Sequence, residues 1–209
     1  MNDVRGTQAK GGPRRALLTY AIWGAALIGV ATVLYVIGGA LIKPGDGDGD
    51  LKSLVRGEMA KLEVTTKANP PPTTPILDAQ GHSITLADLK APVLVVNLWA
   101  TWCAPCVKEM STLAKLQAAY PGRLIVAPIS MDRIGDREKA RAFIAEHSPL
   151  GFYQDPNYAL AFALDPPAEG FPTTLIYDAK GRERARLSGA ADWASPDAHA
   201  VVEALLAQH

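Results

Sequence analysis

Residues 93–110 read VLVVNLWATWCAPCVKEM and combine a strong strand pattern with a strong helix start. The first part of this stretch, residues 93–99, is a continuous apolar and β-branched run of the kind that forms a buried central strand. Pro105 follows shortly after, and the first turn of a helix tolerates proline because no hydrogen-bonded N–H is lost there. The pattern therefore predicts a strand over 93–99 and a helix over 104–119.

Strand and helix patterns alternate on both sides of this stretch, which predicts an α/β domain with a mixed sheet covered on both faces. The closing helix has Ser195 as a natural N-cap and Pro196 at its first position. In chain order, the other predicted elements are a hairpin at 76–86, a helical turn at 86–90, a strand at 123–131, a helix at 135–147, a short strand near 151–154, a helix near 157–164, a hairpin at 173–189 and the closing helix at 195–208.

Residues 16–42 contain no charged side chain. As a helix this segment would be roughly 40 Å long, and a bilayer's hydrocarbon core is about 30 Å thick. A cleaved signal peptide has a shorter apolar stretch, and a buried soluble helix would carry a polar stripe. We therefore predict an uncleaved transmembrane anchor, although the small residues Gly38 and Ala40 leave a cleaved signal peptide as the alternative.

The distribution of Lys and Arg predicts the orientation of this anchor. Four basic residues precede the segment, and those that follow it are diluted among aspartates. Because Lys and Arg are retained on the cytoplasmic side, we expect residues 1–15 in the cytoplasm and the C-terminal domain outside. The preceding cations are Arg5, Lys10, Arg14 and Arg15, and the following ones are Lys43, Lys52 and Arg56.

Residues 43–75 are predicted to be a flexible linker. They begin with the Gly/Asp-rich run KPGDGDGD, which cannot build a core, and end with the semi-rigid spacer NPPPTTP. The polar stretch between the two runs has the pattern of a short amphipathic helix. The predicted organisation is thus a cytoplasmic N-terminus at 1–15, an anchor at 16–42, a linker at 43–75 and a globular domain at 76–209.

The charge balance excludes one class of partner. The chain has 209 residues, with 21 Lys and Arg against 21 Asp and Glu, and therefore no basic excess. Proteins that bind nucleic acids normally carry such an excess on one face. We therefore expect no nucleic-acid partner.

Cys103 and Cys106 are the only cysteines of the chain. A zinc ribbon needs a second pair of ligands, and the four histidines lack zinc-finger spacing. Covalent haem attachment needs a histidine directly after the second cysteine, but that residue is Val107. The pair therefore predicts dithiol–disulfide exchange, without a metal and without a cofactor other than the redox-active disulfide itself.

The predicted helix start assigns a role to each cysteine. A thiol at a helix N-terminus meets free backbone N–H groups and the positive end of the helix dipole, which favour the thiolate. Cys103 is therefore the predicted nucleophile. Cys106 lies one turn along and is the predicted resolving thiol. Trp102 is expected to shape the exposed rim for a partner, whereas Trp99 and Trp193 are expected to pack in the core.

Residues 95–110 resemble the active-site segment of the TlpA-like thiol:disulfide oxidoreductases of the thioredoxin superfamily. The similarity covers roughly residues 76–208 and continues in three further segments. These are Ser130-Met131-Asp132-Arg133, residues 170–174 (GFPTT) and residues 189–193 (GAADW).

This resemblance implies a thioredoxin-like fold, with an extra strand and helix at about 149–168, preceded by one transmembrane helix. It also implies a monomeric reductase in the bacterial cytoplasmic membrane, with its catalytic domain in the periplasm. The implied targets are periplasmic disulfide-containing proteins: copper metallochaperones, cytochrome oxidase subunit II or apocytochromes c. The implied processes are copper-centre assembly or cytochrome c maturation, with a membrane thiol transporter as the electron donor.

The same resemblance adds residues to the site. Pro172 matches a cis-proline that faces the cysteines, and Glu109 matches an acidic residue that tunes the pair or handles protons. Asn97 stands where thioredoxin has a titrating aspartate, which strengthens the case for Glu109. The alternatives are a surface glutamate at 109 and an asparagine at 97 that is satisfied by backbone. The residues expected to contact substrate are Trp102, Ala104, Pro105, Phe171 and Thr173.

Two other functions would use the same cysteines. A general disulfide oxidant differs from a reductase in its reduction potential, which ranges from about −270 mV for thioredoxin to about −120 mV for DsbA. A non-catalytic copper-binding or docking module would hold Cu(I) between two thiolates. The direction of electron flow rests on the family resemblance.

Overall fold

The computed structural model describes residues 23, 29, 48–67 and 69–208. The chain divides into two units, Met1–Pro44 and Gly45–His209. Within the first unit only Trp23 and Gly29 are described, and both are helical. The rest of the anchor predicted at 16–42 lies outside the described residues. Among the described residues, no helix has the length and apolar character needed to cross a membrane.

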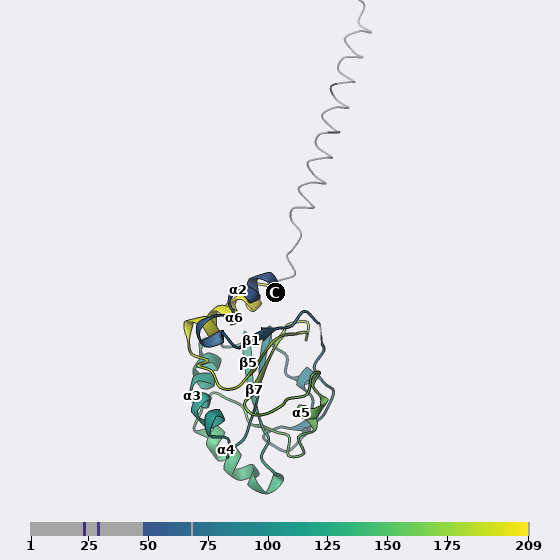
Figure 1. Ribbon diagram of the computed structural model, residues 1–209. Coiled ribbons are helices and arrows are strands. Elements are labelled where there is room, and N and C mark those ends of the chain that lie inside the picture. The colour runs from purple at the N-terminus through teal and green to yellow at the C-terminus, as the bar shows by residue number, and fades with distance from the viewer. Residues whose placement is uncertain (1–22, 24–28, 30–47, 68, 209) are drawn as a thin grey trace, which may run out of the picture. The chain divides into compact units, whose positions relative to one another are not determined.

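The second unit is built on a mixed sheet with the strand order β1-β8-β7-β4-β5-β6-β2-β3 (Figure 1). The central strand β4 pairs in parallel with β5 and antiparallel with β7. The strands are β1 (Leu62–Val64), β2 (Ile76–Leu77), β3 (Ser83–Ile84), β4 (Val93–Trp99), β5 (Leu124–Ser130), β6 (Tyr153–Gln154), β7 (Thr173–Asp178) and β8 (Glu183–Ser188).

Helices cover this sheet, with α3 and α6 on one side of the central strands in Figure 1 and α5 on the other. A hydrogen bond of 2.8 Å joins the Tyr120 hydroxyl at the end of α3 to His199 Nδ1 on α6. The helices are α2 (Asp48–Ser53), α3 (Ala104–Ala119), α4 (Arg137–Ala145), α5 (Ala159–Ala163) and α6 (Pro196–Leu206), with short 3-10 turns η1 (Gly57–Met59), η2 (Leu86–Asp88) and η3 (Ile134–Asp136).

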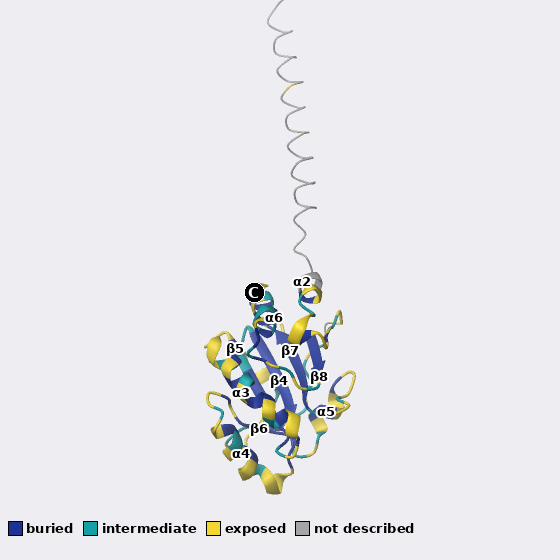
Figure 2. Ribbon diagram, turned by 60° about the vertical axis from the view of Figure 1, so that its left-hand side comes forward, coloured by how far each residue is buried: buried dark blue, intermediate teal, exposed yellow. Residues whose placement is uncertain are grey.

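The core lies between the sheet and these helices, where Figure 2 shows buried strands beneath helices with exposed outer faces. All seven residues of β4 are buried, as its continuous apolar pattern predicts. Asn97 is the single polar residue of this strand and is fully buried. A polar side chain at the centre of the core requires hydrogen-bond partners there, which makes its surroundings informative.

The predicted thioredoxin-like arrangement of a mixed sheet with flanking helices is confirmed. The bounds of β4 and α3 agree with the predicted strand at 93–99 and helix at 104–119. The inserted strand and helix are present as β6 and α5. Ser195 caps α6, since its hydroxyl accepts a hydrogen bond of 3.2 Å from the Ala198 N–H.

The segment predicted to be a linker requires a correction. Part of residues 43–75 belongs to the globular unit: β1 pairs antiparallel with β8, and Leu51, Met59 and Leu62 are buried in the core. The stretch whose pattern resembles a short amphipathic helix folds instead as α2, the turn η1 and the strand β1. The backbone of β8 has N–H and C=O groups to pair, and β1 satisfies them. The folded unit therefore begins well before residue 76.

Candidate active site

The chain turns sharply between β4 and α3. The Cys103 N–H donates to the carbonyl of Ala100 over 3.1 Å, which closes a turn with Thr101 and Trp102 at its centre. Cys103 is the N-cap residue of α3, and proline stands in the first turn of this helix. The end of β4 and the start of α3 thus place Cys103 at the helix N-terminus, where the free backbone N–H groups and the helix dipole act on its sulfur, as predicted.

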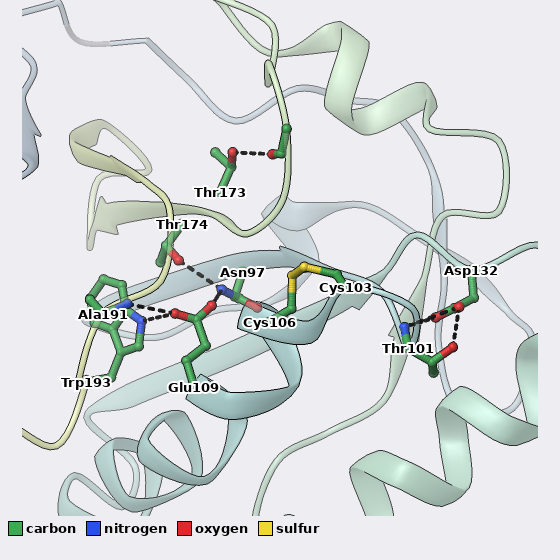
Figure 3. The surroundings of a disulfide bond; sticks show 11 residues. Asn97, Thr101, Cys103, Cys106, Glu109, Asp132, Thr173, Thr174, Ala191 and Trp193 are labelled. Carbon is green, nitrogen blue, oxygen red and sulfur yellow. Dashed lines mark hydrogen bonds between the residues drawn. A yellow bond between two sulfur atoms is a disulfide. The ribbon is translucent and has the colours of Figure 1, made fainter.

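Cys103 and Cys106 form a disulfide, with their Cα atoms 5.3 Å apart (Figure 3). The two cysteines differ in access to solvent. Cys103 is 6% exposed, and Cys106 is completely buried. Because an attacking partner sulfur must come from solvent, Cys103 is the cysteine that it can reach. This difference agrees with the predicted order of nucleophile and resolving thiol.

The Glu109 carboxylate lies one turn along α3 from Cys106 and is buried, with 3% of the residue exposed. It accepts three hydrogen bonds, drawn in Figure 3: 2.8 Å from the Asn97 side-chain amide, 3.1 Å from the Ala191 N–H and 3.1 Å from the Trp193 indole N–H. Burial raises the pKa of Glu109 above its usual range, and the three donors oppose that rise in part. Glu109 is therefore not the surface residue that the sequence left as an alternative.

Asn97 links this carboxylate to the sheet. Its amide nitrogen donates to Glu109 and, over 2.9 Å, to the Thr174 hydroxyl on β7. Both partners of this amide nitrogen are side chains, so the alternative of an asparagine satisfied by backbone does not hold. An amide N–H donor next to a carboxylate stabilises its ionised form without titrating itself.

Sequence reasoning missed the role of residues 191–193. Trp193 is buried as predicted, yet its indole N–H also donates to Glu109, and the neighbouring Ala191 N–H does the same. The backbone N–H of Trp193 also donates a hydrogen bond of 3.1 Å to the Thr112 hydroxyl on α3. The similarity of residues 189–193 to the family was the one signal that could have indicated this contact.

A second buried carboxylate, Asp132, holds the turn that precedes Cys103. It is 1% exposed and accepts two hydrogen bonds from Thr101, one of 3.0 Å from the backbone N–H and one of 2.7 Å from the hydroxyl. The Ser130 hydroxyl at the end of β5 donates to it over 2.9 Å. Figure 3 shows Asp132 beyond Cys103 and Glu109 beyond Cys106. The family resemblance includes Asp132 but does not predict this role for it.

Pro172 lies beside the start of the active-site turn, since its neighbour Thr173 pairs with Leu98 near the end of β4. The peptide bond before Pro172 is cis, as the resemblance predicts. Thr173 is buried, and its hydroxyl donates to the Gly170 carbonyl over 2.7 Å, so this side chain is occupied by its own loop.

The remaining predicted contact residues lie on the surface around Cys103. Trp102 is 62% exposed, and Ala104 and Pro105 are exposed as well. The ring of Trp102 packs edge-on against Phe171, with 6.0 Å between ring centroids. Four of the predicted site residues, Trp102, Ala104, Pro105 and Phe171, thus lie at least partly exposed beside Cys103. The other predicted site residues are buried: Cys106, Glu109, Pro172 and Thr173.

Several known proteins are similar to this chain. The model of the AhpC/TSA family matches residues 64–186, more than half of the chain. The thioredoxin-like protein YneN of Bacillus subtilis is 31% identical over 110 residues, which cover 48% of this chain and 59% of that protein. The thiol-disulfide oxidoreductase ResA of Bacillus cereus is 24% identical over 140 residues, which cover 66% of this chain and 78% of that protein.

Solved structures show the same fold. A putative thiol:disulfide interchange protein DsbE from Chlorobium tepidum has a TM-score of 0.58 at 22% identity, covering 69% of this chain and 99% of that one. A secreted thiol-disulfide isomerase from Corynebacterium glutamicum has a TM-score of 0.59 at 25% identity, and the match covers 70% of this chain and 92% of that one. The names of these relatives bear out the predicted enzyme class, a protein disulfide oxidoreductase. The chain belongs to the AhpC/TSA family and carries its cysteine pair on the thioredoxin-like fold shared by thiol-disulfide oxidoreductases of the ResA and DsbE type.

Proposed function

We propose that this protein is a thiol:disulfide reductase that reduces disulfides of extracytoplasmic target proteins through Cys103 and Cys106. The observation that carries the proposal is the arrangement of the two cysteines at the start of α3, one accessible and one buried beside Glu109. The names of the relatives support exchange chemistry of this type.

The exchange begins from the dithiol form of the protein. The Cys103 thiolate attacks one sulfur of the target disulfide, the target S–S bond breaks, and a mixed disulfide forms at Cys103. The released target thiolate takes up a proton. Cys106 then attacks the Cys103 sulfur, which frees the second target thiolate and forms the Cys103–Cys106 disulfide. Two electrons move from the protein to the target, and the protein's disulfide is the oxidised product.

Glu109 serves as the proton acceptor for Cys106 in the second step. Cys106 is buried, so its thiol proton has no direct path to solvent. Residues three apart on a helix lie on the same face, and Glu109 stands at that spacing from Cys106. Burial raises the pKa of Glu109 towards that of a thiol, and a base works best when its pKa lies near the working pH.

The setting and the partners complete the proposal. The uncharged segment 16–42 and the excess of cations before it support a single-pass anchor in the bacterial cytoplasmic membrane, with the catalytic domain in the periplasm. Suitable targets are copper metallochaperones, cytochrome oxidase subunit II or apocytochromes c. A membrane thiol transporter would resupply the electrons. We propose that the protein works as a monomer and without a further cofactor.

Two measurements test this proposal. The full chain carrying Cys106→Ser, in its reduced form, is mixed with an oxidised peptide that holds a CxxxC disulfide, and it should accumulate a mixed disulfide at Cys103. A matched Cys103→Ser variant should form none. Equilibration with glutathione then gives the reduction potential. A value near that of DsbA, about −120 mV, would favour the general oxidant, and absence of the mixed disulfide would favour the docking module.

A further inference from the structure

The inserted segment between β6 and α5 brings a third aromatic ring to the active-site face. The ring of Tyr158 stacks on Phe171 with 6.0 Å between centroids and 24° between planes. Phe171 in turn packs edge-on against Trp102 at 6.0 Å. The three rings come from the inserted segment, the cis-proline loop and the active-site turn. We call these three residues the aromatic row.

The backbone at Tyr158 is unusual for its residue type. It has φ 61° and ψ 15°, and within the described residues it is the one non-glycine residue with positive φ. Glycine and asparagine take this conformation most readily, and a bulky residue there is an outlier. Residues held in such conformations cluster at ligand-binding sites. The presence of a tyrosine at this position is thus not explained by the needs of the backbone.

The surrounding segment holds Tyr158 in place. The buried Asp155 carboxylate accepts a hydrogen bond of 2.7 Å from the Leu160 N–H and one of 3.3 Å from the Asn157 N–H, and these two residues stand on either side of the tyrosine. The Asp155 N–H donates to the Ser130 carbonyl at the end of β5 over 2.8 Å. The backbone on either side of Tyr158 is therefore anchored to the central sheet through Asp155.

The dimensions of the aromatic row suit one kind of occupant. Two centroid separations of 6.0 Å give a row at most about 12 Å long, and an extended chain rises about 3.3 Å per residue. The row therefore spans three to four residues of an extended segment. Side chains two residues apart lie on the same face of such a segment, so two of them would meet the rings together.

We propose that Tyr158 is a specificity-determining residue that binds large apolar side chains two and four residues from the reactive cysteine of a target protein. This inference rests on the proposed function, because the row is continuous with Trp102 and hence with Cys103. The occupant is an extended, disulfide-bearing segment of the target. Aromatic rings provide large, rigid contact surfaces for apolar side chains.

The test compares two oxidised peptides with the same CxxxC disulfide. One carries Leu two and four residues from each cysteine on its outer side, and the other carries Ser at those positions. In single-turnover mixing with the reduced full chain in excess, the second-order rate constant of reduction should be about tenfold higher for the Leu peptide, and Tyr158→Ala should remove most of this preference. Tyr158→Phe should retain it, because the ring remains.

Further variants separate binding from folding. Tyr158→Gly removes the ring and suits the positive φ, so it should lose the preference even if the Ala variant is unstable. Phe162→Ala is the matched control: Phe162 is 71% exposed on α5 and lies outside the row, and the preference should persist. An unchanged preference in Tyr158→Gly would overturn this inference. Failure of the wild-type chain to reduce either peptide would instead overturn the proposed function.

Discussion

Two buried carboxylates flank the cysteine pair, and they differ in what they bind. Glu109, on the Cys106 side, accepts hydrogen bonds from an amide, an indole and one backbone N–H. Asp132, on the Cys103 side, accepts from one backbone N–H and from the hydroxyls of Thr101 and Ser130. Two acidic groups at similar depth are thus attached to different parts of the site.

The attachments imply different tasks. The donors to Glu109 come from β4 and from the segment before α6, and none belongs to the turn that carries Cys103. Asp132 binds that turn directly, through both the N–H and the hydroxyl of Thr101. We infer that Glu109 serves proton transfer at Cys106, whereas Asp132 fixes the position of Trp102 and Cys103.

Asp132→Ala should give the largest effect, and it should be an effect on stability. The change leaves a backbone N–H and two hydroxyls without their acceptor, and each unsatisfied buried group costs about 1–3 kcal/mol. The free energy of unfolding, measured in urea, should fall by about 3 kcal/mol or more. Glu169→Ala is the control, since Glu169 is exposed and lies in no helix or strand, and the change should alter this value by less than about 0.5 kcal/mol. Equal losses in the two variants would refute the role of Asp132.

Glu109→Gln should act on rate. The amide cannot accept the Cys106 proton, and general-base catalysis of this kind contributes about 10²-fold or more. The rate of disulfide closure should fall by about this factor. In the wild type that rate should rise as the pH increases through the pKa of Glu109, which burial places above the usual range. Stopped-flow fluorescence over a pH series should show this rise in the wild type and not in the variant.

The same shift has a consequence for stability. A carboxyl whose pKa is raised on folding binds more protons in the folded state, so its contribution to stability is present at low pH. That contribution is lost as the pH rises from the unfolded pKa through the folded one. The slope of unfolding free energy against pH in that window should be less negative in Glu109→Gln. An identical slope would show that Glu109 titrates normally.

Trp193→Phe should give the smallest effect, a shift in the pH profile. It keeps an aromatic ring but removes one N–H donor to the Glu109 carboxylate, and this donor lowers the pKa of Glu109. The pH midpoint of disulfide closure should move upward, with a several-fold lower rate below it. Trp99→Phe is the control, because the buried Trp99 indole nitrogen has no hydrogen-bond partner in the described residues. If the midpoint moves equally in both variants, the Trp193 indole N–H does not set the pKa of Glu109.

The sequence predicted the parts of the fold that rest on local pattern. The apolar run of β4 and the proline in the first turn of α3 define both elements, and the cysteine spacing follows from them. The donors to Glu109 could not be predicted in this way. Ala191 and Trp193 stand 82 and 84 residues from Glu109 in sequence, and only the folded chain brings them together.

The missed strand β1 has a different cause. Residues 62–64 are too short to show a period, and their pairing depends on β8, which lies more than a hundred residues away. Likewise the sequence of its segment does not single out Tyr158, because its backbone conformation and its ring partners depend on the folded chain. Local pattern therefore predicts the frame of the site, and tertiary contacts supply its electrostatics and its partner surface.

Strand β1 also determines where this protein tolerates being cut. β1 is an edge strand of the sheet, and it covers the outer side of β8. A fragment beginning at residue 76 would expose that side as an unpaired template for intermolecular strand addition, and it would lose the buried side chains of Leu51, Met59 and Leu62. Such a fragment should aggregate, whereas proteolytic release ahead of residue 48 would leave the sheet protected.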